Sequence, residues 1–193
     1  MSEEYLDLVD ENGNLTGEKE LRSVCHAKGL WHQTVHIYLF RKNNGQMELL
    51  THQRSKEKET SPNKWASSFG GHVKNGETIN ETILSETEEE IGLKIKIEDL
   101  IIGFNKKYDG TINREYIYVF YLLFEDNLNK LSFNDGEVQQ VKWRSFAEIE
   151  KAVKSTHDIW STKLDNLHLV EKDLLSKIAY QKKKPLSRFL FLD

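Results

Sequence analysis

The chain has little of what marks a secreted, membrane-spanning or nucleic-acid-binding protein. It has one cysteine, Cys25, so no disulfide can form within the chain, and a reducing compartment is indicated. No apolar run reaches the roughly 18 residues of a membrane-spanning helix. The acidic start, MSEEYLDLVD, also lacks the apolar stretch of a signal peptide. With 27 Lys plus Arg against 31 Asp plus Glu, the net charge of −4 argues against a general nucleic-acid surface. We therefore expect a soluble cytoplasmic protein that binds neither membranes nor nucleic acid.

Strand and helix patterns are mixed along the 193 residues, which contain no internal repeat and no low-complexity linker. One sizeable core, and hence one domain, is the default for this length. Strands are predicted over 5–10, 34–41, 47–53, 100–108, 114–124 and 138–143. Helices are predicted over 78–91, 146–154 and 163–180. The turn at 43–45 makes the second and third strands a hairpin. In the last helix the expected buried positions are Leu164, Leu167, Leu174, Leu175 and Ile178.

Residues 71–93, GHVKNGETINETILSETEEEIGL, hold the strongest signal. Glu77, Glu86, Glu89 and Glu90 place four carboxylates within fourteen residues. Like charges at helical spacing destabilise a helix by a few tenths of a kcal/mol per pair. A divalent metal is the obvious neutraliser, because Mg²⁺ is held by one or two carboxylates together with substrate phosphates.

The same segment predicts a helix with defined ends. Thr78 and Glu81 fit a capping box at its start, and Gly92 fits a C-cap at its end. An apolar stripe recurs every four residues, at Ile79, Ile83, Thr87 and Ile91. Glu86 and Glu90 then lie along the edge of this stripe, which predicts an acidic wall beside the core. The alternative is a solvated acidic helix face.

The segment resembles the Nudix box, in which a glycine and a glutamate precede the run R-E-U-x-E-E-x-G-U, with U an aliphatic residue. The matching positions are Gly71, Glu77, Glu86, Glu89, Glu90, Gly92 and Leu93. The resemblance implies an α/β protein with the Nudix α/β/α sandwich and its mixed sheet.

The resemblance also implies the chemistry of the site. Glu86, Glu89 and Glu90, with the Gly71 carbonyl, would bind Mg²⁺, or Mn²⁺ in its place. Glu86 and Glu89 are also catalytic candidates, and Glu89 or Glu137 would serve as the general base. The implied reaction is hydrolysis of the pyrophosphate bond in a nucleoside diphosphate linked to another group.

Two box positions depart from the pattern, since Ser85 stands where the family has arginine and Thr87 where it has an aliphatic residue. The family arginine orients the box glutamates, and loss of such a contact typically costs about 10–100-fold. Lys74 is the nearest substitute cation in the sequence. The departure at Ser85 supports a second hypothesis, a catalytically weak protein that binds a nucleotide or diphosphate.

Over about residues 5–155 the chain resembles the isopentenyl-diphosphate-isomerase-like branch of Nudix proteins. The isomerases use a cysteine just before the Gly-His pair that here is Gly71-His72, and this chain has none there. Without a thiol to relay protons, isomerisation is the least favoured hypothesis. Their histidine-rich metal set is kept only in part: His32 and His72 match, His26 is one residue off the expected spacing, Glu115 matches and Asn113 does not.

Other candidates lie outside the box. Arg54 stands where related proteins contact a substrate phosphate, with a surface salt bridge as the alternative. His72 is a second substrate-binding candidate, whereas we expect His36, on a strand, to be a packed residue. We expect one Nudix domain over 1–193, with an N-terminal extension over about 1–33 and a C-terminal helical extension over about 156–193. The apolar residues 189–192 either cover the core or pair two copies in a homodimer.

Overall fold

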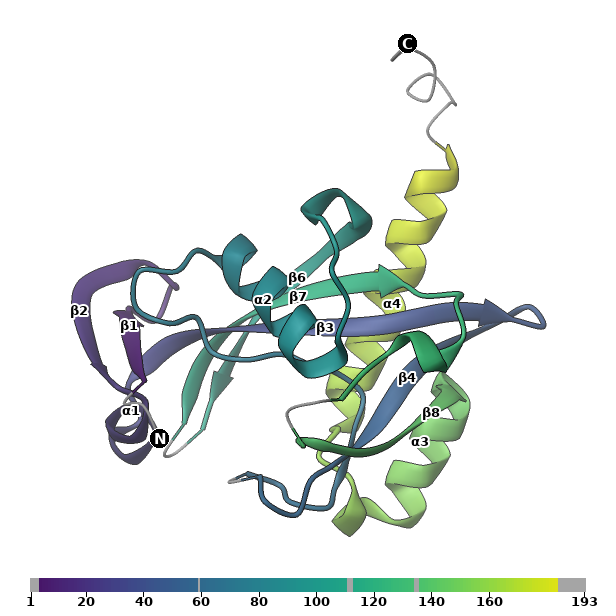
Figure 1. The fold of residues 1–193 in the computed structure, drawn as a ribbon, viewed down its shortest axis with the longest axis horizontal. Coiled ribbons are helices and arrows are strands. Elements are labelled where there is room, and N and C mark those ends of the chain that lie inside the picture. Colours follow the sequence, from purple (N-terminus) through teal and green to yellow (C-terminus); the bar gives the residue numbers. More distant parts are fainter. Residues whose placement is uncertain (1–3, 59, 111–112, 134–135, 184–193) are drawn as a thin grey trace.

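A computed structural model describes residues 4–58, 60–110, 113–133 and 136–183 (Figure 1). The strands are β1 (Tyr5–Val9), β2 (Leu15–Leu21), β3 (Trp31–Asn43), β4 (Gln46–Arg54), β5 (Trp65–Ala66), β6 (Leu100–Asp109), β7 (Arg114–Leu123) and β8 (Val138–Ser145). The helices are α1 (Arg22–Lys28), α2 (Ile79–Ile91), α3 (Phe146–Ser155) and α4 (Leu164–Lys183). Short 3₁₀ turns cover Ile97–Asp99, Leu128–Lys130 and His157–Ile159.

A mixed sheet with the strand order β6-β7-β3-β4-β8 forms the centre of the molecule. Only β3 and β7 run parallel in this series, and their pairing extends over ten residues of each strand. The predicted hairpin of β3 and β4 is confirmed. Asn44 and Gly45 have φ angles of 47° and 82°, the left-handed geometry of a tight hairpin turn. The β1–β2 hairpin joins one end of β3 through the pair Leu8–His32.

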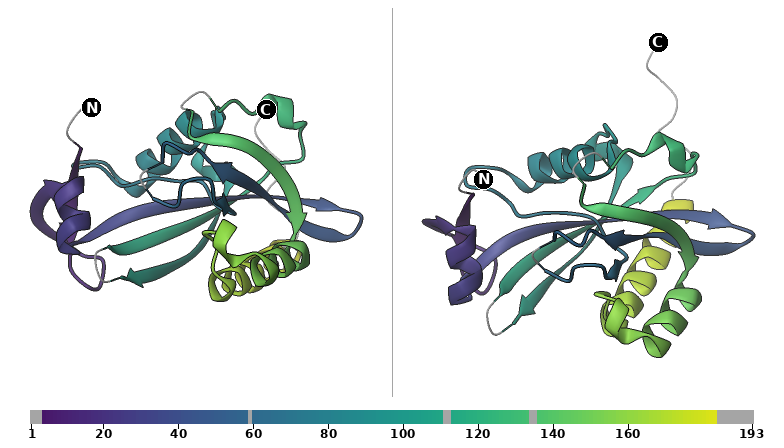
Figure 2. Two further views of the ribbon diagram at one scale, coloured as in Figure 1. Left: turned by 90° about the horizontal axis from the view of Figure 1, so that it is seen from below. Right: turned by 60° about the horizontal axis from the view of Figure 1, so that its bottom comes forward.

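Helices cover both faces of the sheet, which confirms the α/β/α sandwich (Figure 2). Alternate residues of β3 supply both cores because successive side chains of a strand point to opposite faces. Val35, Ile37 and Leu39 pack with α2, whereas Tyr38 and Phe40 pack with α3 and α4. The sheet therefore separates the acidic helix from the two C-terminal helices.

The α2 helix begins and ends as its sequence predicts. Thr78 accepts a hydrogen bond from the Glu81 backbone and Glu81 accepts one from the Thr78 backbone, which completes the capping box. Gly92 ends the helix with a φ of 71°, a conformation that glycine adopts without strain. The stripe residues Ile83 and Ile91 are fully buried, so one face of α2 is fixed against the sheet.

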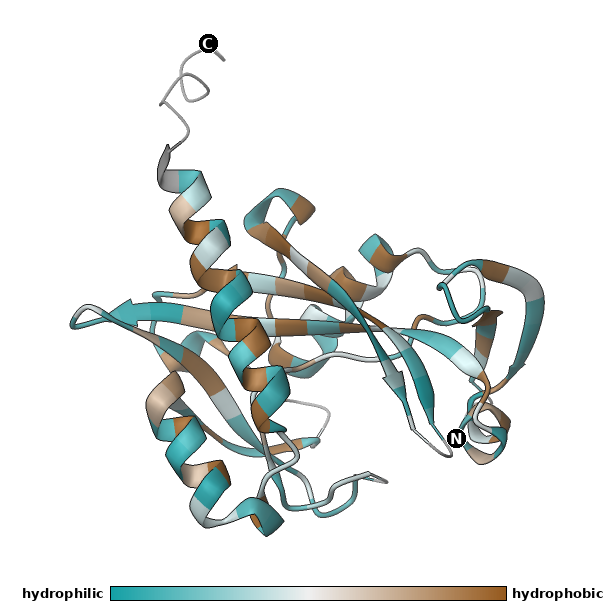
Figure 3. Cartoon of the chain, turned by 180° about the vertical axis from the view of Figure 1, so that it is seen from behind, coloured by the Kyte–Doolittle hydropathy of each residue, from teal (hydrophilic) through white to brown (hydrophobic). Residues whose placement is uncertain are grey.

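Two parts of the fold differ from the prediction. The strand β2 and helix α1 are absent from it, because β2 is exposed along most of its length and carries no apolar alternation. On α4 the prediction is wrong at Leu175, which is 46% exposed. The buried face runs through Leu167, Val170 and Leu174 instead, and one further residue turns a side chain about 100° away. Figure 3 shows hydrophobic and hydrophilic residues alternating along this helix.

The C-terminal part of the predicted helical extension, including the apolar residues 189–192, lies outside the described residues. The homodimer and the division into extensions stay predictions. No helix within the described part of the chain is long and apolar enough to cross a membrane.

Candidate functional site

The site residues predicted from the sequence line one pocket of about 990 Å³, here called the acidic pocket. It lies between α2, the segment 70–74, the end of β4 and the loop before β8. The predicted residues that line it are Arg54, Gly71, His72, Glu86, Glu89, Glu90 and Glu137. Residues 83 positions apart in the sequence thus meet at one place.

Glu86 is pressed against the backbone at Gly71. A Cβ atom at position 71 would lie 2.3 Å from the Glu86 carboxyl carbon, so glycine is what allows the close approach. Burial raises the pKa of Glu86 to about 7, and the charge of Glu90 acts in the same direction. Lys74 opposes the rise, as expected of a neighbouring cation. This carboxyl therefore lies where its ionised form is costly unless a cation neutralises it.

Glu90 is 8% exposed, and each of its two carboxylate oxygens has an interaction partner. Its Oε2 accepts a hydrogen bond of 2.7 Å from the Gly70 backbone N–H. Its Oε1 lies 3.6 Å from Nζ of Lys58, and the same ammonium donates a short hydrogen bond to Glu137. Lys58 therefore links the helix carboxylate to the carboxylate of the β8 loop.

Lys58 is the functional candidate that sequence reasoning missed. Ser85, which replaces the box arginine, donates its hydroxyl to the Thr82 carbonyl at 3.1 Å and brings no charge to the glutamates. The charge comes from Lys58 beside Glu90 and from Lys74 near Glu86. Lys58 lies in a charged run that is typical of a solvated loop, and nothing in its spacing indicates that it turns inward.

Glu89 and Glu77 differ from these buried carboxylates. Glu89 is exposed at the pocket, and among the described residues it has no hydrogen bond or ion pair. Glu77 instead accepts a hydrogen bond of 2.9 Å from the Thr82 hydroxyl, so it shapes the start of α2. The Glu89 carboxylate is thus free to accept a proton.

Arg54 holds the loop that follows β4. Its guanidinium donates to the Thr60 carbonyl at 3.1 and 2.9 Å and to the Thr60 hydroxyl at 3.2 Å. Within the described ranges Arg54 has no direct ion pair, although the charge of Glu90 opposes the fall in its pKa that burial causes, and the surface salt bridge stays a prediction. The side chain lines the acidic pocket, where a phosphate could meet it.

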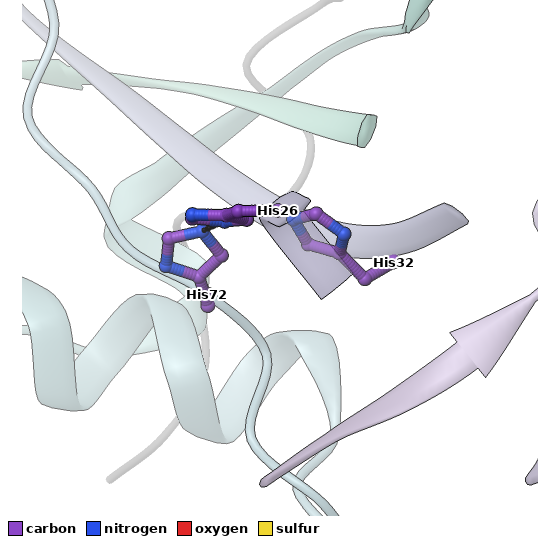
Figure 4. Close-up of side chains that lie close together, drawn as sticks. All are labelled: His26, His32 and His72. Atoms are coloured by element: carbon purple, nitrogen blue, oxygen red, sulfur yellow. Dashed lines mark hydrogen bonds between the residues drawn. The ribbon is translucent and has the colours of Figure 1, made fainter. Parts of the chain in front are cut away.

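The structure brings His26, His32 and His72 together beside the acidic pocket (Figure 4). One ligand nitrogen of each lies within 4.8 Å of the others, and the Nε2 atoms of His26 and His72 are 3.1 Å apart. His26 therefore joins the group despite its shifted spacing, because α1 turns it toward the start of β3. The group is a second place that could hold a divalent metal through imidazole ligands.

The protonation of the cluster suits metal binding. His32 Nδ1 donates to the Leu30 carbonyl at 2.9 Å. The buried Nε2 atom of the same ring therefore carries a lone pair, and it has no hydrogen-bond partner among the described residues. Burial lowers the pKa of His32, and it lowers that of His72 to about 2, so both rings stay neutral. Glu115 is hydrogen-bonded by Asn113 at 2.6 Å. His36 is half-buried on β3 and lines the acidic pocket, so its role as a packed residue stays a prediction.

The profile of the NUDIX domain matches residues 30–164. The chain belongs to the Nudix family. An uncharacterised Nudix hydrolase of Clostridium acetobutylicum is 36% identical over 124 residues, a match that covers 62% of this chain and 59% of that protein. An isopentenyl-diphosphate Delta-isomerase of Aliivibrio fischeri is 28% identical over 166 residues, or 82% of this chain and 89% of that enzyme.

The same fold occurs in a crystal structure from Deinococcus radiodurans, with a TM-score of 0.63 and 24% identity over 88% of this chain and 99% of that one. The relatives named as isomerases support the isomerase-like branch of the Nudix superfamily. The one cysteine of this Nudix chain, Cys25, is buried in α1 and lines neither of the pockets described.

Proposed function

We propose that this Nudix protein is a Mg²⁺-dependent hydrolase that cleaves the pyrophosphate bond of a nucleoside diphosphate linked to another group. The observation that carries the proposal is the convergence of Glu86, Glu89, Glu90 and Glu137 on one pocket. Family membership supports the reaction class, and the nucleoside is the substrate type that the Nudix resemblance implies.

The carboxylates fit a hard divalent cation. Glu86 and Glu90 repel each other across a partly buried wall, and their oxygens are the ligand type that Mg²⁺ prefers. Glu89 and the Gly71 carbonyl complete the proposed ligand set, and Mn²⁺ could use the same oxygens. When bound, the metal would supply charge to polarise the phosphoryl oxygens and to lower the pKa of a coordinated water.

The chain's own residues then have separate tasks. Arg54 and His72 would contact the diphosphate oxygens, while Lys58 holds Glu90 and Glu137 in place. The water attacks phosphorus, its proton passes to a carboxylate, and the leaving phosphate takes the electrons of the broken P–O bond. Glu89 is the better base, because Glu137 already accepts from Lys58 whereas Glu89 has no such partner within the described part of the chain.

A second candidate is a diphosphate-binding protein with weak catalysis, which the uncharged Ser85 favours. Product release from nucleoside diphosphates, triphosphates, dinucleotides and sugar conjugates, with and without Mg²⁺, separates the two. We expect metal-dependent turnover by the wild type and less than about a tenfold gain in Ser85→Arg, since Lys58 and Lys74 already supply cations.

Turnover that appears only in Ser85→Arg would favour the binding protein. Formation of an allylic product from isopentenyl diphosphate, tested in the same panel, would support the isomerase instead.

A further inference from the structure

A second pocket of about 570 Å³ adjoins the acidic pocket. His36, Arg54, Gly70 and Glu90 line both pockets, so the two meet along one wall. The second pocket lies among the end of β6, the loop before α2 and the start of α4. A molecule held at the acidic pocket can therefore extend into it.

Three lysines line this second pocket, here called the lysine pocket: Lys106 and Lys107 of β6, and Lys163 just before α4. Lys106 of β6 donates a short hydrogen bond to the Asn166 side chain of α4, and Asn166 in turn donates to the Tyr38 hydroxyl at 3.0 Å. Lys163 stands just before α4, with its Nζ 5.0 Å from the centre of the Tyr108 ring. Among the residues that the structure describes, the direct partners of the Lys106 and Lys163 ammonium groups are neutral.

Three carboxylates, those of Glu90, Glu115 and Asp165, also line the lysine pocket. Across residues 4–183, apart from the undescribed positions, neither Lys106 nor Lys163 forms an ion pair. Burial, helped by the charge of Lys163, lowers the pKa of Lys106 to about 8, with Glu115 opposing the shift. Glu115 itself is engaged by the Asn113 amide. Lys106 is partly desolvated, and the exposed Lys163 adds a like charge near it, so an anion between the two ammonium groups would lower the cost of keeping Lys106 charged.

The histidines that line the lysine pocket do not contribute positive charge to it. Burial lowers the pKa of His36 and of His52 to about 3, so both rings are neutral near pH 7. Glu90, Glu115 and Asp165 form no ion pair with Lys106 or Lys163 within the described part of the chain. The cationic character of the pocket therefore comes from its lysines and from Arg54.

We propose that the lysine pocket binds a phosphate monoester carried by the substrate, beyond the diphosphate that is cleaved. A phosphate monoester bears close to two negative charges at pH 7, which matches the two ammonium groups. The inference rests on the proposed function of the acidic pocket and narrows it to diphosphates that carry a further phosphate.

Matched substrates that differ by one phosphate test the proposal: coenzyme A against dephospho-coenzyme A, and NADPH against NADH. We expect the wild type to favour the phosphate-bearing member by about tenfold in kcat/KM, as for a charge-assisted contact. The ratio should fall toward one in Lys106→Met/Lys163→Met. It should persist in Lys151→Met, an exposed lysine on α3 that lines neither pocket. Because each variant is judged by the ratio of kcat/KM for the two matched substrates, a loss of activity that affects both substrates equally does not change the result.

Metal-free calorimetry with adenosine 3′,5′-bisphosphate and AMP gives a second readout that needs no turnover. Tighter binding of the bisphosphate by the wild type, lost in the double variant, supports the proposal. A wild type without the preference, or a double variant that keeps it, overturns the proposal while hydrolysis still stands. If none of the substrates is hydrolysed, the proposed function fails, and the calorimetry alone decides whether the lysine pocket binds phosphate.

Discussion

The acidic pocket and the lysine pocket share a wall but hold their charges in different ways. In the acidic pocket Lys58 bridges Glu90 and Glu137, and Lys74 lies near Glu86. In the lysine pocket the direct partners of Lys106 and Lys163 among the described residues are neutral, an amide and an aromatic ring. The first pocket is thus partly neutralised by the protein itself, whereas in the second the proposed phosphate would meet Lys106 and Lys163 directly. A substrate that spans both would place metal-bound phosphates on one side and a free phosphate on the other.

The largest expected effect comes from removing a proposed metal ligand of the acidic pocket. Glu86→Gln should weaken Mg²⁺ binding by about 100-fold or more, because loss of an outer partner of a metal ligand already costs about 10–100-fold. Calorimetric titration with Mg²⁺ measures the change. Glu88→Gln on the same helix is the control, since Glu88 is exposed and pairs with Lys94 at 3.1 Å. Equal Mg²⁺ affinity in both variants would remove Glu86 from the site.

A smaller effect is expected from the cation that links the two carboxylates. Lys58→Met should lower kcat by about 10–100-fold through loss of orientation at Glu90 and Glu137. Lys56→Met is the matched control, because that lysine is highly exposed and its one ion pair among the described residues is with its neighbour Glu57, at 3.6 Å. If Lys58→Arg restores activity, orientation by charge is the role of the residue. Unchanged kcat in Lys58→Met would show that the box works without any replacement for its arginine.

The smallest expected effect is on the thermal stability of the ligand-free protein, and we expect the same direction of change for both pockets. If each pocket holds costly like charges, Glu86→Gln and Lys106→Met should each raise the Tm of the metal-free protein. A relief of about 1 kcal/mol corresponds to about 2–4 °C for a chain of this size. Differential scanning calorimetry in chelator measures it. A lower Tm in Lys106→Met alone would mean that the hydrogen bond from Lys106 to Asn166 stabilises the protein more than the repulsion between like charges destabilises it. The two pockets would then differ in their effect on stability.

Local sequence signals were enough to predict the part of the acidic pocket that α2 forms. The capping residues, the apolar stripe and Gly92 define α2 without reference to the rest of the chain. The turn at Asn44 and Gly45 likewise defines the β3–β4 hairpin. Because the box residues are close in sequence, their spacing alone places them on one wall.

The other parts of the fold and of the two pockets depend on contacts between segments that are distant in the sequence. Lys58 meets Glu137 across 79 residues, and Lys106 meets Asn166 across 60, so no spacing rule could pair them. The strand β2 escaped prediction because pairing with β1, not apolar alternation, makes it a strand. Leu175 was misplaced because the leucines on α4 allow two adjacent stripes, and only packing against the sheet selects the one through Leu174.

The most direct test of the account is the rate of diphosphate hydrolysis over a Mg²⁺ titration, compared among the wild type, Glu89→Gln and Glu88→Gln. Glu89 opens onto the acidic pocket, whereas its neighbour Glu88 does not line it. We predict metal-dependent turnover by the wild type and Glu88→Gln, and a loss of about 100-fold or more in Glu89→Gln, as expected when a general base is removed. Equal rates in the two variants, or turnover that does not respond to Mg²⁺, would contradict the assignment of the acidic pocket as a metal-dependent hydrolytic site.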